Sequence, residues 1–141
     1  MQNILVAIDS ADHSHKITDE AIKLAEALNA EVTLLSVYED VTTRMPEISH
    51  SDMEKIHQAN IESIEKFLHE EAERFREKGI PVKTRLDKGH PGQVICDLAK
   101  QGGFSYVVLG NRGKSGVSEL LLGSVSNRVA HCAETNVILI K

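Results

Sequence analysis

The sequence has no excess of positive charge, no long hydrophobic run and few cysteines, and each absence narrows what the protein can do. Its 141 residues include 16 Lys and Arg against 21 Asp and Glu, which gives a formal net charge of −5. Nucleic-acid-binding domains present a basic face, so this acidic balance argues against that class. No apolar run approaches the roughly 20 residues that cross a bilayer, so we expect no membrane span.

The N-terminal stretch MQNILVAIDS lacks the basic segment and the small-residue cleavage site of a secretory signal peptide. Its apolar part is predicted to be the first strand of the fold. We therefore expect a cytoplasmic protein.

The two cysteines, Cys96 and Cys132, do not make a disulfide framework, and neither belongs to a C-x-x-C pair. Free cysteines in such proteins usually behave as small buried side chains. We expect two reduced thiols on the inner faces of helices.

The seven histidines do not have the spacing of a metal site. The sequence contains no H-E-x-x-H motif, no Cys/His pairing and no i,i+4 pair of histidines. His13, His15 and His90 are predicted to lie in loops, where we expect solvated side chains. The sequence therefore predicts no bound structural or catalytic metal.

Short β-rich apolar runs alternate with segments of helical periodicity. Continuous apolar runs suit strands that are covered on both faces, as in parallel sheets. The alternation predicts a single α/β domain over residues 1–141, with a parallel sheet, helices on both faces and a ligand edge at the carboxyl ends of the strands. The predicted strands are 4–8, 31–37, 81–87, 106–110 and 136–140, and the predicted helices lie around 17–28, 52–78, 94–99 and 124–134.

The longest predicted helix runs from Asp52 to Lys78 and stops at Gly79, a residue type common at helix ends. The charged residues along it are expected to form a solvated face. Its apolar residues recur at helical spacing and predict a stripe facing the core, formed by Met53, Ile56, Ile61, Ile64, Phe67, Leu68, Ala72 and Phe75.

The tripeptide Gly113-Lys114-Ser115 looks like the end of a phosphate-binding P-loop, but its context excludes one. The P-loop pattern requires a glycine at position 108, where this chain has Val108 inside a predicted strand. The G-x-G-x-x-G fingerprint of dinucleotide-binding folds is also absent after every predicted strand.

The same loop carries a different pattern, G-x-x-G-x9-G-S, formed by Gly110, Gly113, Gly123 and Ser124. Glycines let backbone amides approach and point at an anion. The start of the following helix, with the hydroxyls of Ser124 and Ser126, favours phosphate through its partial positive charge. Arg112 lies inside the loop and adds a cationic fork for a phosphate oxygen. The alternative is a flexible loop in which Ser124 is a simple N-cap.

With ILVAID at the start, GHPGQVI after the third strand and NVILI at the end, this pattern resembles the universal stress protein family over essentially the whole chain. The most specific part is the terminal stretch GNRGKSGVSELLLGSVSNRVAHCAETNVILIK, which resembles the family's ATP-binding subgroup and its G-x-x-G-x9-G-[ST] signature. The resemblance implies an open five-stranded parallel sheet of order 3-2-1-4-5, an adenine nucleotide α-hydrolase-like fold. It also implies ATP bound across the carboxyl ends of strands one and four, and a homodimer.

The resemblance assigns nucleotide contacts to nine residues: Asp9 near the ribose and phosphates, the backbone of Val37 near adenine, Gly110, Arg112 and Gly113 along the polyphosphate, and Gly123, Ser124, Val125 and Ser126 closing over it. The turn after the first strand departs from the family pattern D-G-S-x-x-S, because this chain reads DSADHS. Position 105, often acidic in the family, is Ser105.

Asp9 follows the first strand, beside the predicted anion site. A bare carboxylate repels phosphate, so we expect it to accept from a ribose hydroxyl or to bind a bridging Mg²⁺. The alternative is that Asp9 serves only as a turn or N-cap residue.

The last predicted strand, residues 136–140, is apolar and lies at a sheet edge. An uncovered apolar edge favours pairing with another chain, in agreement with the homodimer that the resemblance implies. The alternative is an edge shielded by Lys141 and the adjacent helix.

Three functions remain open on the sequence. The first, which we favour, is an ATP-binding stress-response module with an unknown protein partner and at most slow ATP hydrolysis, because the sequence shows no water-activating base and no second acidic metal ligand. The second is a nucleotide hydrolase or adenylyl-transferring enzyme, assisted by Asp9, His13 or His15. The third is a dimeric interaction scaffold that binds no nucleotide. A receiver domain is a weaker rival, because the first turn lacks its paired acids.

Overall fold

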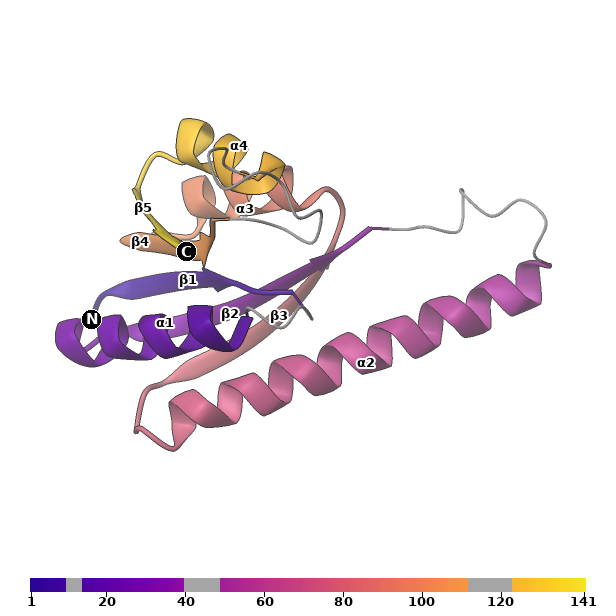
Figure 1. Ribbon diagram of the computed structural model, residues 1–141, viewed down its shortest axis with the longest axis horizontal. Coiled ribbons are helices and arrows are strands. Elements are labelled where there is room, and N and C mark those ends of the chain that lie inside the picture. The colour runs from indigo at the N-terminus through magenta and orange to yellow at the C-terminus, as the bar shows by residue number, and fades with distance from the viewer. Residues whose placement is uncertain (10–13, 40–48, 112–122) are drawn as a thin grey trace.

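The computed structural model describes residues 1–9, 14–39, 49–111 and 123–141, in which strands and helices alternate. Figure 1 shows a sheet with helices on both sides. The predicted alternation is confirmed, with most boundaries shifted by one or two residues. The elements are β1 (Asn3–Ala7), α1 (Ser14–Leu28), β2 (Glu31–Tyr38), α2 (His50–Arg76), β3 (Val82–Lys88), α3 (Pro91–Gln101), β4 (Tyr106–Gly110), α4 (Ser124–Cys132) and β5 (Asn136–Ile140).

The five strands form one parallel sheet in the order β3-β2-β1-β4-β5. The predicted strand order is therefore confirmed. At its centre, Val6 of β1 pairs with Leu34 of β2 and with Val108 of β4. These side chains are buried because helices cover both faces of a parallel sheet, which explains why the central strands read as continuous apolar runs.

The helices divide between the two faces of the sheet. On one face, α1 and α2 cover a core that includes Ile4, Leu34 and Phe75. On the other face, α3 and α4 cover a core that includes Leu5 and Val129. The chain changes face after β3, and α3 and α4 pack against each other over a core with residues from β1, β2, β4 and β5.

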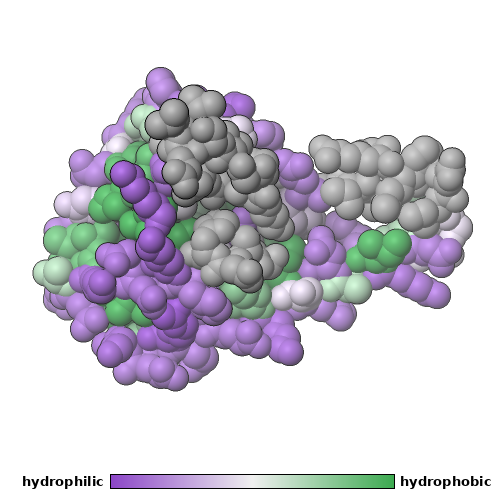
Figure 2. Space-filling view, viewed as in Figure 1, coloured by the Kyte–Doolittle hydropathy of each residue, from purple (hydrophilic) through white to green (hydrophobic). Residues whose placement is uncertain are grey.

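Helix α2 is the longest element and is only partly packed. Leu68 and Phe75 are buried, as predicted from the apolar stripe. At the other end of the helix, Ile56 is 46% exposed and Met53 and Ile61 are half-buried, so the prediction that the whole stripe faces the core is wrong there. The reason is geometric: the first turns of α2 project beyond the sheet (Figure 1), and Figure 2 shows hydrophobic surface on this projecting part.

The ends of α2 agree with the chemistry of helix caps. The Ser49 side chain accepts a hydrogen bond from the backbone N–H of Asp52 at the start of the helix. Gly79 has a φ of 72°, a left-handed conformation that glycine adopts without a steric penalty. This conformation reverses the chain into β3, as the glycine after the predicted helix indicated.

Cys96 and Cys132 form a disulfide, with Cα atoms 5.9 Å apart, so the expectation of two reduced thiols is wrong. The physical reason is the register of α3 and α4. One helical turn before each cysteine, Gly92 packs so tightly against Arg128 that a Cβ atom on Gly92 would lie 2.8 Å from Arg128 Cδ. Both pairs have a sequence separation of 36 residues, so the two helices run parallel and in step.

No helix in the described part of the chain combines the length and the hydrophobicity that a bilayer crossing requires.

Candidate functional site

The sheet has a switch point between β1 and β4. From β1 the chain proceeds outward to β2 and β3 on one side, and the later strands β4 and β5 lie on the other side. In open α/β sheets the connections leave a crevice at such a point, beyond the carboxyl ends of the two strands. Asp9 follows β1 there, and Gly110 ends β4. The structure thus brings these two predicted site residues to neighbouring strand ends.

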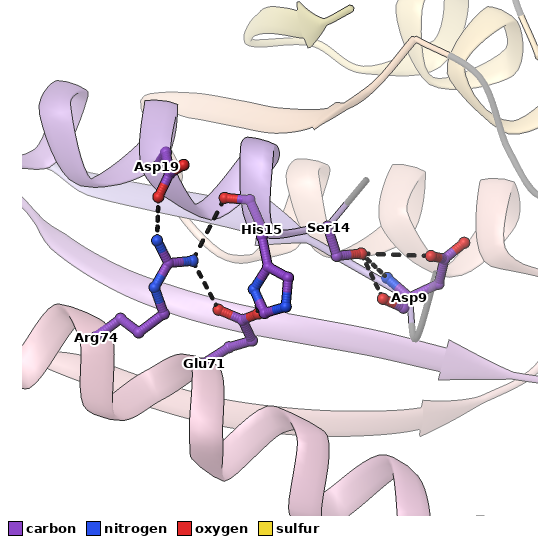
Figure 3. Close-up of polar contacts among 6 residues, drawn as sticks. All are labelled: Asp9, Ser14, His15, Asp19, Glu71 and Arg74. Atoms are coloured by element: carbon purple, nitrogen blue, oxygen red, sulfur yellow. Dashed lines mark hydrogen bonds and ion pairs between the residues drawn. The ribbon is translucent and has the colours of Figure 1, made fainter. Parts of the chain in front are cut away.

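Asp9 is held by Ser14, the first residue of α1. The Ser14 hydroxyl donates a hydrogen bond to the backbone carbonyl of Asp9 and accepts one from the backbone N–H of Asp9 at 3.3 Å. It also lies 3.4 Å from the Asp9 carboxylate oxygen Oδ1. Ser14 is fully buried, and Figure 3 shows its hydroxyl turned toward Asp9. The backbone of Asp9 is therefore fixed against the start of α1.

Val37 lies near the end of β2, where its backbone extends past β1. Just past β1, Ile8 donates its backbone N–H to the carbonyl of Leu35 in β2 at 2.9 Å. Backbone groups alternate sides along a strand, so the N–H and C=O of Val37 face the same side as those of Leu35. Because β1 ends at Ala7, these groups face the space beyond its carboxyl end.

The two ends of the glycine-rich loop meet at Asn111, which follows β4. The carbonyl of Asn111 accepts hydrogen bonds from the Gly123 backbone N–H at 3.0 Å and from the Ser126 hydroxyl at 2.9 Å. The Asn111 N–H in turn donates to the carbonyl of Ile140 in β5 at 2.7 Å. The start of α4 is therefore anchored to the carboxyl ends of β4 and β5.

Among the described residues, no side chain caps the N-terminus of α4. Gly123 occupies the N-cap position, so the alternative that Ser124 is the N-cap is wrong. The first intrahelical bond of this end runs from the Asn127 N–H to the Gly123 carbonyl at 2.9 Å. The N–H groups of Ser124, Val125 and Ser126 precede it and have no partner within the helix. Such groups, with the helix dipole, attract an anion.

The three predicted residues of α4 differ in exposure. Ser124 is exposed and Val125 is half-buried, whereas Ser126 is buried and its hydroxyl also lies 3.0 Å from the Gly123 carbonyl. The Ser126 hydroxyl thus holds the loop ends together. Arg112 and Gly113 lie outside the described residues, so their part in the site rests on the sequence pattern.

The sequence patterns did not identify Asn111, and they did not identify Ser14 as the buried residue that holds the backbone of Asp9. Asn111 contributes through its backbone carbonyl and N–H, which every residue other than proline has, so no side-chain pattern marks it. Ser14 was visible as the last serine of the turn after β1, a position from which a hydroxyl caps a neighbouring backbone.

A charged cluster beside Asp9 and Ser14 joins α1 to α2 (Figure 3). The Glu71 carboxylate is 1% exposed, and its Oε2 accepts from Arg74 Nη1 at 3.0 Å. Arg74 also bonds to the Asp19 carboxylate and, at 3.4 Å, to the His15 carbonyl. Glu71 Oε1 lies 2.5 Å from His15 Nδ1 but lacks the alignment of a hydrogen bond.

The pKa of the Arg74 guanidinium reflects opposing influences in this cluster. Partial burial lowers it, but the hydrogen bonds to Glu71 and Asp19, with the attraction of both carboxylates, more than offset the burial and raise it above its ordinary value. Arg74 therefore stays charged at any physiological pH and neutralises the buried Glu71.

Two pockets of about 340 and 650 Å³ lie at the opposite end of the strands from the candidate site. Both contact the amino ends of strands, at Asn3, Glu31 and Lys83. Ligands of such sheets bind at the carboxyl ends, so these pockets do not belong to the candidate site. Within the described ranges, no three His, Cys, Asp or Glu side chains gather as metal ligands do.

The fold defines the chain as a doubly wound α/β protein, and its candidate ligand site lies at the carboxyl ends of β1 and β4. The profile of the Universal stress protein family matches residues 1–141, and the chain belongs to this family.

Individual relatives agree with this assignment. The chain is 35% identical to universal stress protein YxiE of Bacillus subtilis (strain 168), over 98% of this chain and 97% of the relative. Among solved structures it is similar to universal stress protein UspA from Lactobacillus plantarum, with a TM-score of 0.76, 26% identity and coverage of 99% and 97% of the two chains. It is also similar to a universal stress protein in complex with cAMP, with a TM-score of 0.73, 27% identity and coverage of 99% and 95%.

Proposed function

We propose that this protein binds ATP in the crevice between the carboxyl ends of β1 and β4 and acts as a nucleotide-responsive module of the stress response. The observation that carries the proposal is the N-terminus of α4, which no side chain caps among the described residues and which Asn111 and Ser126 anchor to the end of β4. The backbone N–H groups of its first turn have no partner within the helix and suit a phosphate group. Nucleotide occupancy changes the loop between Gly110 and Gly123, and a partner protein recognises the change.

Each part of ATP has a place along the crevice in this proposal. The polyphosphate takes the backbone of Gly110 and Gly123 and the N–H groups that begin α4, together with Arg112 and Gly113 from the sequence pattern. Asp9, whose backbone Ser14 fixes, accepts from the ribose or holds Mg²⁺ with the phosphates. The backbone of Val37 faces the space beyond β1 and reads the edge of adenine.

The solved relative in complex with cAMP supports an adenine nucleotide as the ligand class, because cAMP carries both adenine and a phosphate. ATP in place of another adenine nucleotide rests on the glycine pattern. We expect at most slow ATP hydrolysis, since the sequence shows neither a water-activating base nor the second acidic metal ligand of efficient ATPases.

Calorimetric titration of Mg-ATP into nucleotide-free protein tests the proposal. We expect saturable binding of one nucleotide per chain, and loss of that binding in Gly113→Val, where the added side chain blocks the approach of the backbone to the phosphates. Circular dichroism checks that the variant keeps its fold. Absence of binding by the wild-type protein at millimolar ATP would exclude the proposed function and favour the scaffold alternative.

A second part of the proposal concerns assembly. β5 lies at the edge of the sheet, beside β4, and its apolar residues from Val137 to Ile140 are only half-buried. An apolar edge strand favours pairing with a second copy, so we expect a homodimer through residues 136–140. Analytical ultracentrifugation at micromolar concentration is expected to show a dimer, and a monomer would contradict this part. A cytoplasmic location remains an expectation from the sequence.

A further inference from the structure

The disulfide joins α3 to the last turn of α4, the helix whose first turn forms the proposed phosphate site. Cys132 ends α4 and Ser124 begins it, so about 12 Å of helix separates the disulfide from the phosphate site. The parallel register of α3 and α4 presents Cys96 to Cys132 one turn after Gly92 meets Arg128. The covalent link therefore fixes the end of α4 that lies opposite the site.

Helix α4 depends on its packing. It has nine residues, and helices of this length are marginal in water without tertiary contacts. Its buried residues are Ser126 and Val129, and Ser126 is the residue whose hydroxyl binds the Asn111 carbonyl. Looser packing of α4 against α3 therefore weakens the hydrogen bond from Ser126 to Asn111, which positions the proposed phosphate site.

We propose that Cys96 and Cys132 form a reversible thiol–disulfide switch that sets how firmly α4 is held against α3. The reductant is a low-molecular-weight thiol such as glutathione, and the oxidant is the corresponding disulfide. In the reduced state the two helices keep only their noncovalent contacts, and the N-terminus of α4 is less firmly positioned. The effect on nucleotide affinity rests on the proposed function, whereas the effect on α4 itself does not.

The two sulfurs differ in access, which gives the exchange a direction. Cys96 is 2% exposed and Cys132 is half-buried. A reductant thiolate therefore attacks Cys132 Sγ, the S–S bond breaks, and Cys96 leaves as a thiolate that takes up a proton. A second thiol attacks the reductant sulfur of the mixed disulfide and releases the Cys132 thiol. In sum, two thiols are oxidised to one low-molecular-weight disulfide, and two protein thiols form.

The test uses the full chain after treatment with glutathione disulfide or with excess glutathione. Alkylation under denaturing conditions, followed by intact mass, counts the free thiols. Hydrogen exchange measures the Gly123 and Asn127 amides at the start of α4, which donate to the carbonyls of Asn111 and Gly123. Calorimetry measures Mg-ATP affinity. The double variant C96S/C132S serves as a permanently reduced form, and it receives both treatments.

We expect no free thiol after oxidation and two after reduction. In the reduced protein, amide exchange at the start of α4 is about fivefold to tenfold faster, and ATP affinity is about fivefold to tenfold lower. C96S/C132S has no thiol to count, and it matches the reduced protein in amide exchange and in ATP affinity under both treatments. A thiol count that neither treatment changes, or equal exchange rates in both redox states, would overturn the switch. If ATP binds to neither state, the proposed function fails, and the thiol count with the exchange rates still decides the switch. Equal ATP affinity in two states that both bind overturns the coupling.

Discussion

Replacing Arg74 with leucine is expected to lower the free energy of unfolding by about 2–3 kcal/mol, because it leaves the buried Glu71 carboxylate without its cationic partner. Among the described residues, Glu71 would then keep its poorly aligned contact with His15 and no other polar partner. The substitution also removes the bonds from Arg74 to Asp19 and to the His15 carbonyl, which join α2 to the first turns of α1. Urea denaturation of the wild-type and variant proteins measures the difference.

Two controls distinguish the cost of leaving a buried carboxylate unpaired from the cost of losing any ion pair on α2. Arg76→Leu removes the ion pair with Glu73 in the same helix, whose partners are 44% and 60% exposed, and is expected to cost less than about 1 kcal/mol. The double variant E71L/R74L removes both members of the buried pair and is expected to recover most of the loss. If Arg74→Leu is no less stable than Arg76→Leu, the buried pair does not stabilise the contact between the two helices.

Ser124→Asp is expected to weaken Mg-ATP binding at least about tenfold without lowering stability. Ser124 is the exposed first residue of α4, and a carboxylate there adds a negative charge beside the proposed phosphate site. The same charge interacts favourably with the helix dipole, so α4 itself gains stability. Calorimetry measures the affinity, and thermal unfolding measures the stability.

Ser51→Asp provides the matched control for this charge. Ser51 is exposed in the first turn of α2, a helix whose N-terminus does not take part in the proposed site. We expect unchanged ATP affinity in this variant. Raising the salt concentration should reduce the defect of Ser124→Asp, because ions screen the repulsion between exposed charges. Equal affinities for Ser124→Asp and the wild type would show that the phosphates bind elsewhere.

Much of the fold was predictable because local patterns and the global architecture agree. Buried central strands such as β1 read as continuous apolar runs, and glycine at position 79 supplies the positive φ that ends α2. The alternation of strands and helices then predicts a parallel sheet with its ligand edge at the carboxyl ends. The strand order came from the resemblance to the family, since alternation alone leaves several orders open.

The features that the sequence did not predict depend on how helices, strands and loop ends are positioned against one another in the folded chain. Cys96 and Cys132 meet because α3 and α4 run in step on one face of the sheet, which the spacing of two cysteines does not reveal. Ile56 follows the helical stripe but is exposed, because it belongs to the first turns of α2 and these turns project beyond the sheet. Asn111 joins the loop ends through backbone atoms, which carry no signature in the sequence.

Amide NMR of the protein during a titration with Mg-ATP tests the central claim most directly, because it reports where the ligand binds. The account predicts shifts at Asp9, Val37, Gly110 and the residues that begin α4, with little change at Lys83 and Gln101, which line a pocket at the opposite end of the strands. Shifts centred on Lys83 and Gln101, with none at the start of α4, would contradict it.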